Sequence, residues 1–250
     1  MSVQQVASLI KNAKRLVILT GAGVSKESGV PTFRDAMDGL WAKYDPQQLA
    51  TPRAFAKNPQ LVWDWYAYRR GLVSNAKPNA GHFALAHLEK IHPNLWIITQ
   101  NVDDLHEQAG STRLIRLHGN IAETICYNQC QGERVTIDKN DFVWDENHTT
   151  PPKCPHCHAY LRPNVVWFEE TLPRNALQSA FDISAKCDVM LVIGTSGLVS
   201  PASQLPHMAE NSGATLIEIN PEKSEITPYA HFHLKGASGA VLPALLEALT

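Results

Sequence analysis

Short runs of apolar residues alternate along the chain with longer stretches that have helical spacing. Most of these runs are apolar on both faces, as is typical of buried parallel strands. They predict strands at Leu16–Thr20, Leu95–Thr99, Leu114–Leu117, Val189–Ile193, Thr215–Ile219 and His231–Leu234. The intervals between several of them leave room for crossover helices. The pattern therefore predicts an α/β fold with a doubly wound, parallel, Rossmann-type sheet.

Glycine or polar residues follow five of these strands. In open α/β sheets, ligands bind beyond the carboxyl ends of the strands. The segments are Gly21-Ala22-Gly23, Gln100-Asn101-Val102-Asp103, His118-Gly119-Asn120, Gly194-Thr195-Ser196 and Asn220-Pro221-Glu222. Five such ends predict a ligand site at this edge of the sheet.

Two segments interrupt the alternation of strands and helices. Residues 36–78 are helical in pattern and rich in aromatic residues, and residues 122–162 contain four paired cysteines and several prolines. Both are interpreted as insertions, one helical and one a zinc module, that form a smaller lobe. The remaining residues, 1–35, 79–121 and 163–250, are expected to form the Rossmann-type domain. A cleft between two lobes is a usual place for a substrate.

Composition and charge exclude several classes of function. The chain has 250 residues, 44% of them hydrophobic, which supports one large domain or a large domain with a small one attached. A formal net charge of -2 gives no general attraction to nucleic acid or to an anionic membrane. The apolar runs are too short to span a bilayer, and residues 1–15 lack the continuous apolar region of a secretory signal. We therefore expect a cytoplasmic protein that binds neither nucleic acid nor membrane.

The glycines after the first strand have two interpretations. Gly21-Ala22-Gly23 lies between a strand and an expected helix, where glycines let the backbone approach a pyrophosphate. However, Lys26 stands where a dinucleotide motif has its third glycine. A tight strand-to-helix turn explains the spacing equally well.

Four of the five cysteines form two close pairs. Cys126 and Cys130 are spaced C-x3-C, and Cys154 and Cys157 are spaced C-x2-C. With no export signal in the sequence, four such thiolates predict a bound metal rather than disulfides. Because four cysteine ligands fill a tetrahedral zinc site, the metal is expected to be structural. Cys187 has no partner in the sequence, and apolar packing is its expected role.

Several segments together resemble the sirtuin family. They are Gly21–Arg34, which reads GAGVSKESGVPTFR, together with Thr99–Asp103, His118–Asn120, Gly194–Ser196 and Asn220–Glu222. They occur in family order and cover nearly the whole chain. The resemblance implies an enzyme that consumes NAD to remove acyl groups from protein lysines and holds one structural Zn²⁺ per chain. The first cysteine pair has one residue more than the C-x2-C usual in the family.

The resemblance implies three groups of NAD contacts. A cofactor loop would wrap the pyrophosphate and contribute Gly21, Ala22, Gly23, Ser25, Thr32, Phe33 and Arg34. The nicotinamide half would be held by Gln100, Asn101, Val102 and Asp103, and the adenosine half by Gly194, Thr195, Ser196, Asn220, Pro221, Glu222 and Ser238. Phe33 would screen the reacting ribose from water. Ser238 stands where the family usually has alanine.

His118 is one of 11 histidines, and by itself it indicates little, because most histidines make ordinary surface or core hydrogen bonds. The resemblance implies that the acyl-lysine carbonyl oxygen attacks C1′ of the NAD ribose as nicotinamide leaves. His118 would then be the general base for a ribose hydroxyl, with Asn101 as a second catalytic residue. A histidine pKa of about 6.5 suits this role. The products would be free lysine, nicotinamide and O-acyl-ADP-ribose.

Tyr66 and Arg69 are three residues apart in a helical segment, so they share one helix face. The simplest interpretation is a surface pair stacked on neighbouring aromatic residues. The segment also resembles the Tyr-x-x-Arg segment of class III sirtuins, which implies removal of succinyl, malonyl or glutaryl groups as well as acetyl. Arg69 would grip the terminal carboxylate and Tyr66 would add a hydroxyl donor, with Ala50 leaving room for a longer chain.

Val166, Trp167 and Phe168 resemble the family strand that pairs with the backbone of the substrate peptide. The family pattern is Val-Trp-Phe-Gly-Glu, and here Glu169 replaces the glycine. This departure puts peptide affinity or sequence preference in doubt. The sequence leaves open whether Glu169 favours basic residues beside the target lysine or weakens binding of acidic acyl groups.

Three other functions fit parts of the sequence. An NAD-dependent oxidoreductase shares the fold, although its glycine motif differs. A mono-ADP-ribosyltransferase would use the same scaffold. A non-enzymatic module that binds zinc and a nucleotide is disfavoured by intact His118 and Asn101, which a decayed site would be expected to lose.

Overall fold

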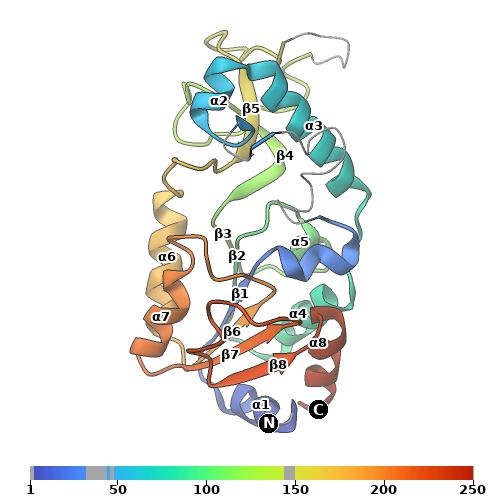
Figure 1. Cartoon of the computed structure of the whole chain (residues 1–250), viewed down its shortest axis with the longest axis vertical. Coiled ribbons are helices and arrows are strands. Elements are labelled where there is room, and N and C mark those ends of the chain that lie inside the picture. The colour runs from blue at the N-terminus through green and yellow to red at the C-terminus, as the bar shows by residue number, and fades with distance from the viewer. Residues whose placement is uncertain (1–2, 32–43, 46–47, 144–149, 250) are drawn as a thin grey trace. The chain divides into compact units, whose positions relative to one another are not determined.

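The computed structural model describes residues 3–31, 44–45, 48–143 and 150–249 (Figure 1). The chain divides into two compact units. Unit 1 comprises Met1–Thr32, Ala76–Leu117 and Leu172–Thr250, and unit 2 comprises Phe33–Asn75 and His118–Thr171.

Unit 1 is built on a six-stranded parallel sheet in the order β3-β2-β1-β6-β7-β8. The strands are β1 Leu16–Thr20, β2 Leu95–Thr99, β3 Leu114–Arg116, β6 Val189–Ile193, β7 Thr215–Asn220 and β8 Phe232–Lys235. All six predicted strands are present, with bounds that differ by at most one residue. The strand order reverses between β1 and β6, where a doubly wound sheet forms its ligand crevice. The predicted Rossmann-type fold is therefore confirmed.

Helices cover both faces of this sheet (Figure 1). One layer contains α1 Val3–Asn12, α4 Ala80–Ile91 and α8 Ser238–Glu247, and the other contains α6 Arg174–Ser184 and α7 Gln204–Asn211. The short α5, Leu105–Gln108, follows β2. Side chains of β1 alternate between the layers, with Leu16 and Ile18 in the first core and Val17 and Leu19 in the second. Each such buried aliphatic side chain contributes about 1.5–3 kcal/mol, which explains why the strand is apolar throughout.

Unit 2 combines an antiparallel pair of strands with two helices. The strands are β4 Gly119–Cys126 and β5 Leu161–Val165, and the helices are α2 Pro52–Lys57 and α3 Pro59–Asn75. The helix α2 begins after Thr51, whose hydroxyl accepts a hydrogen bond from the Ala54 N–H at 3.1 Å. Arg70 of α3 donates to the carbonyl oxygens of Ile121 and Glu123, where the register of β4 against β5 shifts.

The helix expected after Gly21 is present as the 3₁₀ helix η1, Ala22–Ser28, which ends because Gly29 adopts a left-handed φ of 81°. The strand β5 ends at Val165, and the segment from Val166 to Phe168 forms no strand with the described residues. Its expected pairing with a substrate peptide stays a prediction. In the described residues, no helix combines the length and the apolar character needed to cross a membrane.

Candidate active site

Three glycines bring the ends of β1 and β6 together in unit 1. The Gly23 N–H donates to the Gly194 carbonyl at 2.8 Å. A Cβ atom on Gly23 would lie 2.7 Å from the Gly194 Cα, and one on Gly21 would lie 2.8 Å from the Gly194 carbonyl oxygen. Any larger residue would push the two strand ends apart. The glycines are therefore required by close backbone packing, and they leave backbone groups at the edge where the strand order reverses.

Ser25 of η1 is the centre of a buried group of polar side chains in the same unit. Its hydroxyl oxygen accepts a hydrogen bond from Asn101 Nδ2 at 3.1 Å and lies 3.4 Å from His82 Nε2. Burial raises the pKa of Asp103, and hydrogen bonds from Ser25 and from the Leu105 N–H oppose that rise. Because the Ser25 oxygen faces two N–H donors, its own proton is directed to Asp103. This arrangement orients the amide of Asn101, whose Oδ1 is buried and has no hydrogen-bond partner among the described residues.

Two buried histidines support this group, and sequence reasoning missed both. His82 Nδ1 accepts from the Asn79 N–H at 3.3 Å, which leaves Nε2 as the protonated nitrogen that faces Ser25. His106 Nε2 lies 3.1 Å from the Thr20 hydroxyl. Burial lowers the pKa of His82 to about 4 and that of His106 to about 3. Both rings are therefore neutral at pH 7. Asn79 and His82 form a capping box at the start of α4, and that Asn-x-x-His spacing was the available signal.

The predicted adenosine residues lie at the ends of β6, β7 and β8. Thr195 is the shared partner, because its hydroxyl accepts from Gln100 Nε2 at 3.1 Å and its carbonyl accepts from Asn220 Nδ2 at 3.0 Å. A shallow pocket beside this loop is lined by Pro221, Glu222, Lys223, His233 and Lys235.

Ser238 begins α8, and its hydroxyl lies 3.3 Å from the carboxylate of Glu27. That carboxylate also accepts from the Gly239 N–H at 2.7 Å. The side chain of Ser238 is thus used within the protein, and only its backbone remains for a ligand contact. Three further residues of the predicted cofactor loop, Thr32, Phe33 and Arg34, lie outside the described residues.

His118 belongs to unit 2, where it directly precedes β4. Its carbonyl oxygen accepts from the Val166 N–H at 3.0 Å. Gly119 has a left-handed φ of 83°, and a Cβ atom there would lie only 2.0 Å from the carbonyl oxygen of Asn164. Only glycine fits, so the His-Gly pair fixes the backbone that carries the imidazole.

Tyr66 and Arg69 lie on the buried face of α3, with 2% and 8% of their surfaces exposed. The Arg69 guanidinium lies 5.8 Å from the centre of the Tyr66 ring, and the Trp167 ring lies 6.2 Å from that ring. Burial raises the pKa of Tyr66, and the positive charges of Arg69 and Arg162 oppose the rise. Ala50 is also buried, and its carbonyl accepts from the Phe168 N–H at 2.9 Å. The interpretation as an exposed surface pair is therefore wrong.

Two charged side chains fix Trp167, one through its ring and one through its backbone. The guanidinium of Arg162 stacks on its ring at 3.4 Å, and Glu170 accepts from the Trp167 N–H at 2.8 Å. Arg162 and Glu170 also form an ion pair at 2.5 Å, with Arg162 only 2% exposed. The segment from Val166 to Phe168 is thereby fixed although it forms no strand with the described residues.

Glu169 keeps the backbone conformation that a glycine would adopt, with a φ of 73°. Its side chain is exposed and forms a two-point ion pair with Arg53 of α2. The carboxylate therefore carries a counter-ion in the folded chain. This arrangement reduces the bias toward basic or away from acidic substrates that an isolated Glu169 would impose.

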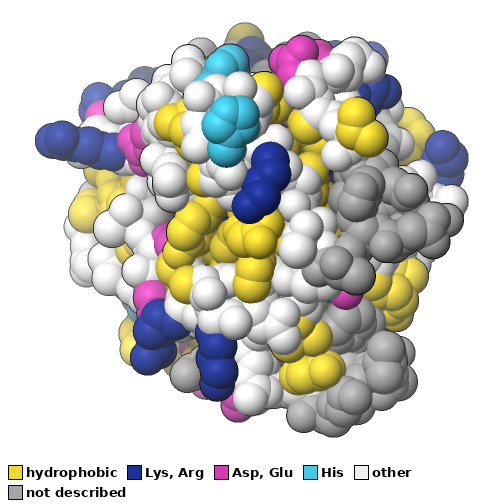
Figure 2. Space-filling view, turned by 90° about the horizontal axis from the view of Figure 1, so that it is seen from above, with side chains coloured by type: hydrophobic (Ala, Val, Ile, Leu, Met, Phe, Trp, Pro, Cys, Tyr) yellow, Lys and Arg dark blue, Asp and Glu magenta, His cyan; other side chains and the backbone are white. Residues whose placement is uncertain are grey.

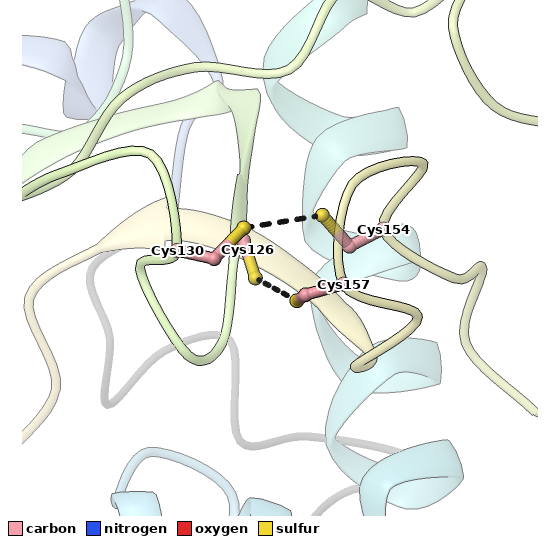
Figure 3. Close-up of side chains that lie close together, drawn as sticks. All are labelled: Cys126, Cys130, Cys154 and Cys157. Atoms are coloured by element: carbon pink, nitrogen blue, oxygen red, sulfur yellow. Dashed lines mark hydrogen bonds between the residues drawn. The ribbon is translucent and has the colours of Figure 1, made fainter.

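Four cysteines form a compact cluster in unit 2 (Figure 3). The Sγ atoms of Cys126 and Cys157 are 3.4 Å apart, and those of Cys130 and Cys154 are 3.7 Å apart. All four sulfur atoms lie within 4.8 Å of one another. Gln129, with a φ of 49°, donates to the Cys126 carbonyl and forms the tight turn of the longer first pair.

The geometry of this cluster fits one structural zinc ion. Four sulfurs at about 2.3 Å from a tetrahedral zinc lie about 3.8 Å from one another, close to the spacing observed. The cluster packs against Trp63, Ile137 and Leu161, so the metal would join β4, β5 and α3 in one core. With four thiolates in place, no coordination position is left open for a substrate.

The outer surface shows no strong charge of one sign on the face drawn in Figure 2. Hydrophobic side chains gather near its centre, and basic, acidic and histidine side chains are scattered around them. This agrees with the small net charge of -2.

Comparison with known proteins assigns these features to one family. A model described as the Sir2 family matches residues 21–201. An NAD-dependent protein deacylase from Pyrococcus abyssi is 48% identical over 98% of this chain and 97% of its own length. The structure of a Sir2 homolog–NAD complex is 44% identical with a TM-score of 0.88, covering 98% of this chain and 93% of that one. A Sir2 complex with a p53 peptide and NAD⁺ is 30% identical with a TM-score of 0.86, covering 99% and 98% of the two chains. The Rossmann-type sheet, the cysteine cluster and these matches show that the chain belongs to the Sir2 family.

Proposed function

We propose that this chain removes acetyl, succinyl, malonyl and glutaryl groups from protein lysines and transfers them to the ADP-ribose of NAD. The chain acts as an NAD-dependent protein deacylase, an activity supported by the Sir2 family and by relatives that carry this name. The substrate is an acyl-lysine in a protein or peptide, in line with the peptide complex among its structural neighbours. A reducing cytoplasm suits four thiolates that hold a metal.

Unit 1 supplies the contacts to NAD. The glycines at the β1–β6 crevice leave backbone groups open to the pyrophosphate, and Asn101 and Asp103 hold the nicotinamide side. The buried Oδ1 of Asn101, which lacks a partner among the described residues, supports this role because a ligand donor would satisfy it. Bound NAD supplies the ribosyl carbon that accepts the acyl oxygen, and nicotinamide is released.

His118 acts as the general base in this proposal. Its imidazole accepts a proton from a ribose hydroxyl, so that the hydroxyl oxygen can bond to the acyl carbon. Addition of water then gives free lysine and O-acyl-ADP-ribose. The rigid Gly119 turn supports the role, because it limits the positions that the imidazole can take.

The choice of acyl group depends on Tyr66 and Arg69. Their burial on one face of α3, beside Trp167, is the observation that carries this part of the proposal. A terminal carboxylate would bind the Arg69 guanidinium through two hydrogen bonds, with the Tyr66 hydroxyl as an additional donor. Ala50 keeps the neighbouring wall small.

The test is mass spectrometry of acetyl-lysine and succinyl-lysine versions of one peptide, incubated with and without NAD. Nicotinamide and the acylated ADP-ribose are measured in the same samples, so that loss of the acyl group is linked to consumption of NAD. We expect NAD-dependent loss of both groups. Formation of NADH would instead support an oxidoreductase, and ADP-ribose retained on protein without deacylation would support a transferase.

The acyl preference is tested with Arg69→Met and Arg69→Lys. Arg69→Met should reduce kcat/KM for the succinyl peptide about a hundredfold and for the acetyl peptide only about twofold. Arg69→Lys keeps the charge but loses the two-point contact, and it should fall between wild type and Arg69→Met. Equal losses on both peptides would reject the assignment.

A further inference from the structure

Glu218 is a buried acid in β7, next to the edge strand of the main sheet. It is 1% exposed, and its neighbour two residues earlier, Leu216, belongs to an apolar core. Placing a carboxylate among aliphatic side chains is costly unless hydrogen bonds compensate it. None of the cofactor, acyl or metal assignments above uses this residue.

Two hydroxyl groups compensate the carboxylate. Ser224 Oγ donates to one carboxylate oxygen of Glu218 at 2.5 Å, and Thr227 Oγ1 donates to the other at 2.6 Å. Each hydroxyl oxygen also accepts from the backbone, because the Ser224 N–H donates to Thr227 Oγ1 at 2.8 Å and the Ile226 N–H donates to Ser224 Oγ at 3.0 Å. Both hydroxyl protons are therefore directed to Glu218, which organises the turn from Ser224 to Thr227.

This turn belongs to the loop that follows β7 and is fastened to the loop that follows β6. The Glu225 N–H donates to the Ser196 carbonyl at 3.1 Å. Ile226 is 1% exposed and fills the space beside Gly197, where a Cβ atom would lie 2.8 Å from the Ile226 side chain. The two loops, 194–197 and 220–227, are therefore joined by hydrogen bonds and by side-chain packing.

We propose that Glu218 is a positioning residue for the adenosine half of NAD. The proposal rests on the proposed function and on the adenosine contacts that the family resemblance implies for Ser196, Asn220 and Glu222. Glu218 lies beneath the loop and does not touch the nucleotide. Its carboxylate holds the turn 224–227, the turn holds the loop after β6, and the two loops together present their backbone and side chains to the ligand.

The two acceptor oxygens of the side chain are essential to this role. Each carboxylate oxygen accepts one hydroxyl proton, whereas a glutamine amide offers only one oxygen and places N–H donors where the second oxygen was. In Glu218→Gln one hydroxyl proton would therefore be left without an acceptor in a buried site. The side chain keeps its shape, so packing of the sheet is retained.

Glu89→Gln is the matched control. Glu89 is 5% exposed and likewise accepts from a threonine hydroxyl, that of Thr112, and from the backbone N–H groups of Thr112 and Arg113. It holds the segment that enters β3, at the amino ends of the strands and away from the ligand edge. Glu89→Gln should lower the melting temperature without a specific effect on the affinity for NAD.

The experiment compares Glu218→Gln with Glu89→Gln in steady-state kinetics and in calorimetric titration with ADP-ribose. For Glu218→Gln we expect about a tenfold rise in the KM for NAD and in the Kd for ADP-ribose, with kcat and the KM for the acyl peptide within about twofold of wild type. For Glu89→Gln we expect both nucleotide constants to stay within about twofold of wild type. An unchanged Kd in Glu218→Gln, or equal rises in both variants, would overturn the proposal.

A second pair of variants keeps the test valid if Glu218→Gln does not fold. Thr227→Ser retains the hydroxyl and should bind ADP-ribose as the wild type does, whereas Thr227→Val removes it and should weaken binding about fivefold. Equal binding by the two variants would contradict the role of the turn. ADP-ribose binding requires no turnover, so a wild-type chain that binds ADP-ribose but removes no acyl group would refute the proposed function and leave the role of Glu218 standing.

Discussion

The two units hold their functional side chains by different physical means. In unit 1, hydrogen bonds join the polar groups around Ser25, and the buried histidines His82 and His106 are neutral. The strand ends beside them pack closely because they carry glycines. In unit 2, guanidinium groups lie over aromatic rings or pair with carboxylates, as Arg162 does with Trp167 and Glu170. Four thiolate ligands complete that unit.

This difference indicates which part of the site is free to vary. Backbone contacts at Gly23 and Gly194 leave no room for a side chain, so the proposed nucleotide-binding edge tolerates little change. The side chains of unit 2 act through charge and size, which substitution can alter while the backbone stays in place. We therefore expect mutations in unit 1 to affect NAD use for every substrate and those around α3 to affect the choice of substrate.

The largest expected effect follows removal of a metal ligand. Cys154→Ala should abolish deacylation and reduce the zinc content from one ion per chain to none, because structural zinc contributes on the order of 10 kcal/mol to small domains. Cys187→Ala is the control, since that cysteine is buried in unit 1 and lies in a different core. Elemental analysis and peptide deacylation measure both variants. Full activity without metal would show that unit 2 does not depend on zinc.

The next largest effect concerns His118. His118→Ala should reduce kcat for acetyl and succinyl peptides alike by about a thousandfold, since general-base catalysis contributes about 10²–10⁴ to the rate. ADP-ribose binding should be unchanged, because the proposed nucleotide contacts belong to unit 1. Activity within tenfold of wild type would exclude the imidazole as the base.

Lowering the pH should destabilise the fold through the buried, neutral histidines of unit 1. The folded-state pKa of His106 is about 3, whereas in the unfolded chain it is about 6.5. The unfolded state therefore binds more protons below pH 6.5, and the stability present above that pH is lost as the pH falls. His106 accounts for about 2 kcal/mol of the loss between pH 6.5 and pH 5.

His106→Gln should flatten this pH dependence by that amount, as measured by urea unfolding at pH 7, 6 and 5. The exposed His87, changed to Gln, serves as the control and should leave the slope unaltered. A His106→Gln variant with the wild-type slope would show that the ring is protonated in the folded state.

The smallest expected effect concerns the ion pair of Arg53 and Glu169. Arg53→Ala leaves the carboxylate without its counter-ion, so peptides with a basic residue beside the target lysine should show about a twofold lower KM, while neutral peptides stay unchanged. Arg53→Ala combined with Glu169→Gly should remove that difference. The difference in KM is measured by competition between a basic and a neutral peptide in one reaction. An equal change for both peptides would show that the ion pair of Arg53 and Glu169 lies outside the peptide groove.

Sequence reasoning found all six strands of the main sheet because buried parallel strands carry a continuous apolar signal. It also found the cysteine pairs, because ligand spacing within a short loop depends on neighbours in the chain. The type of helix at Ala22–Ser28 could not be predicted, because a 3₁₀ helix and an α-helix have similar local patterns. Whether the segment from Val166 to Phe168 forms a strand depends on a partner strand, which a local pattern does not specify.

The sequence alone determined the order of strands and helices, the metal ligands and the family resemblance, because each depends on residue types at short spacing. The tertiary structure decided which distant side chains share a hydrogen bond. It brought Ser25, His82 and Asn101 together, seated Glu218 beneath its loop and paired Arg53 with Glu169. Most of these contacts join residues that are tens of positions apart in the chain. A local sequence pattern cannot predict them, because the distance between such residues depends on how the whole chain packs.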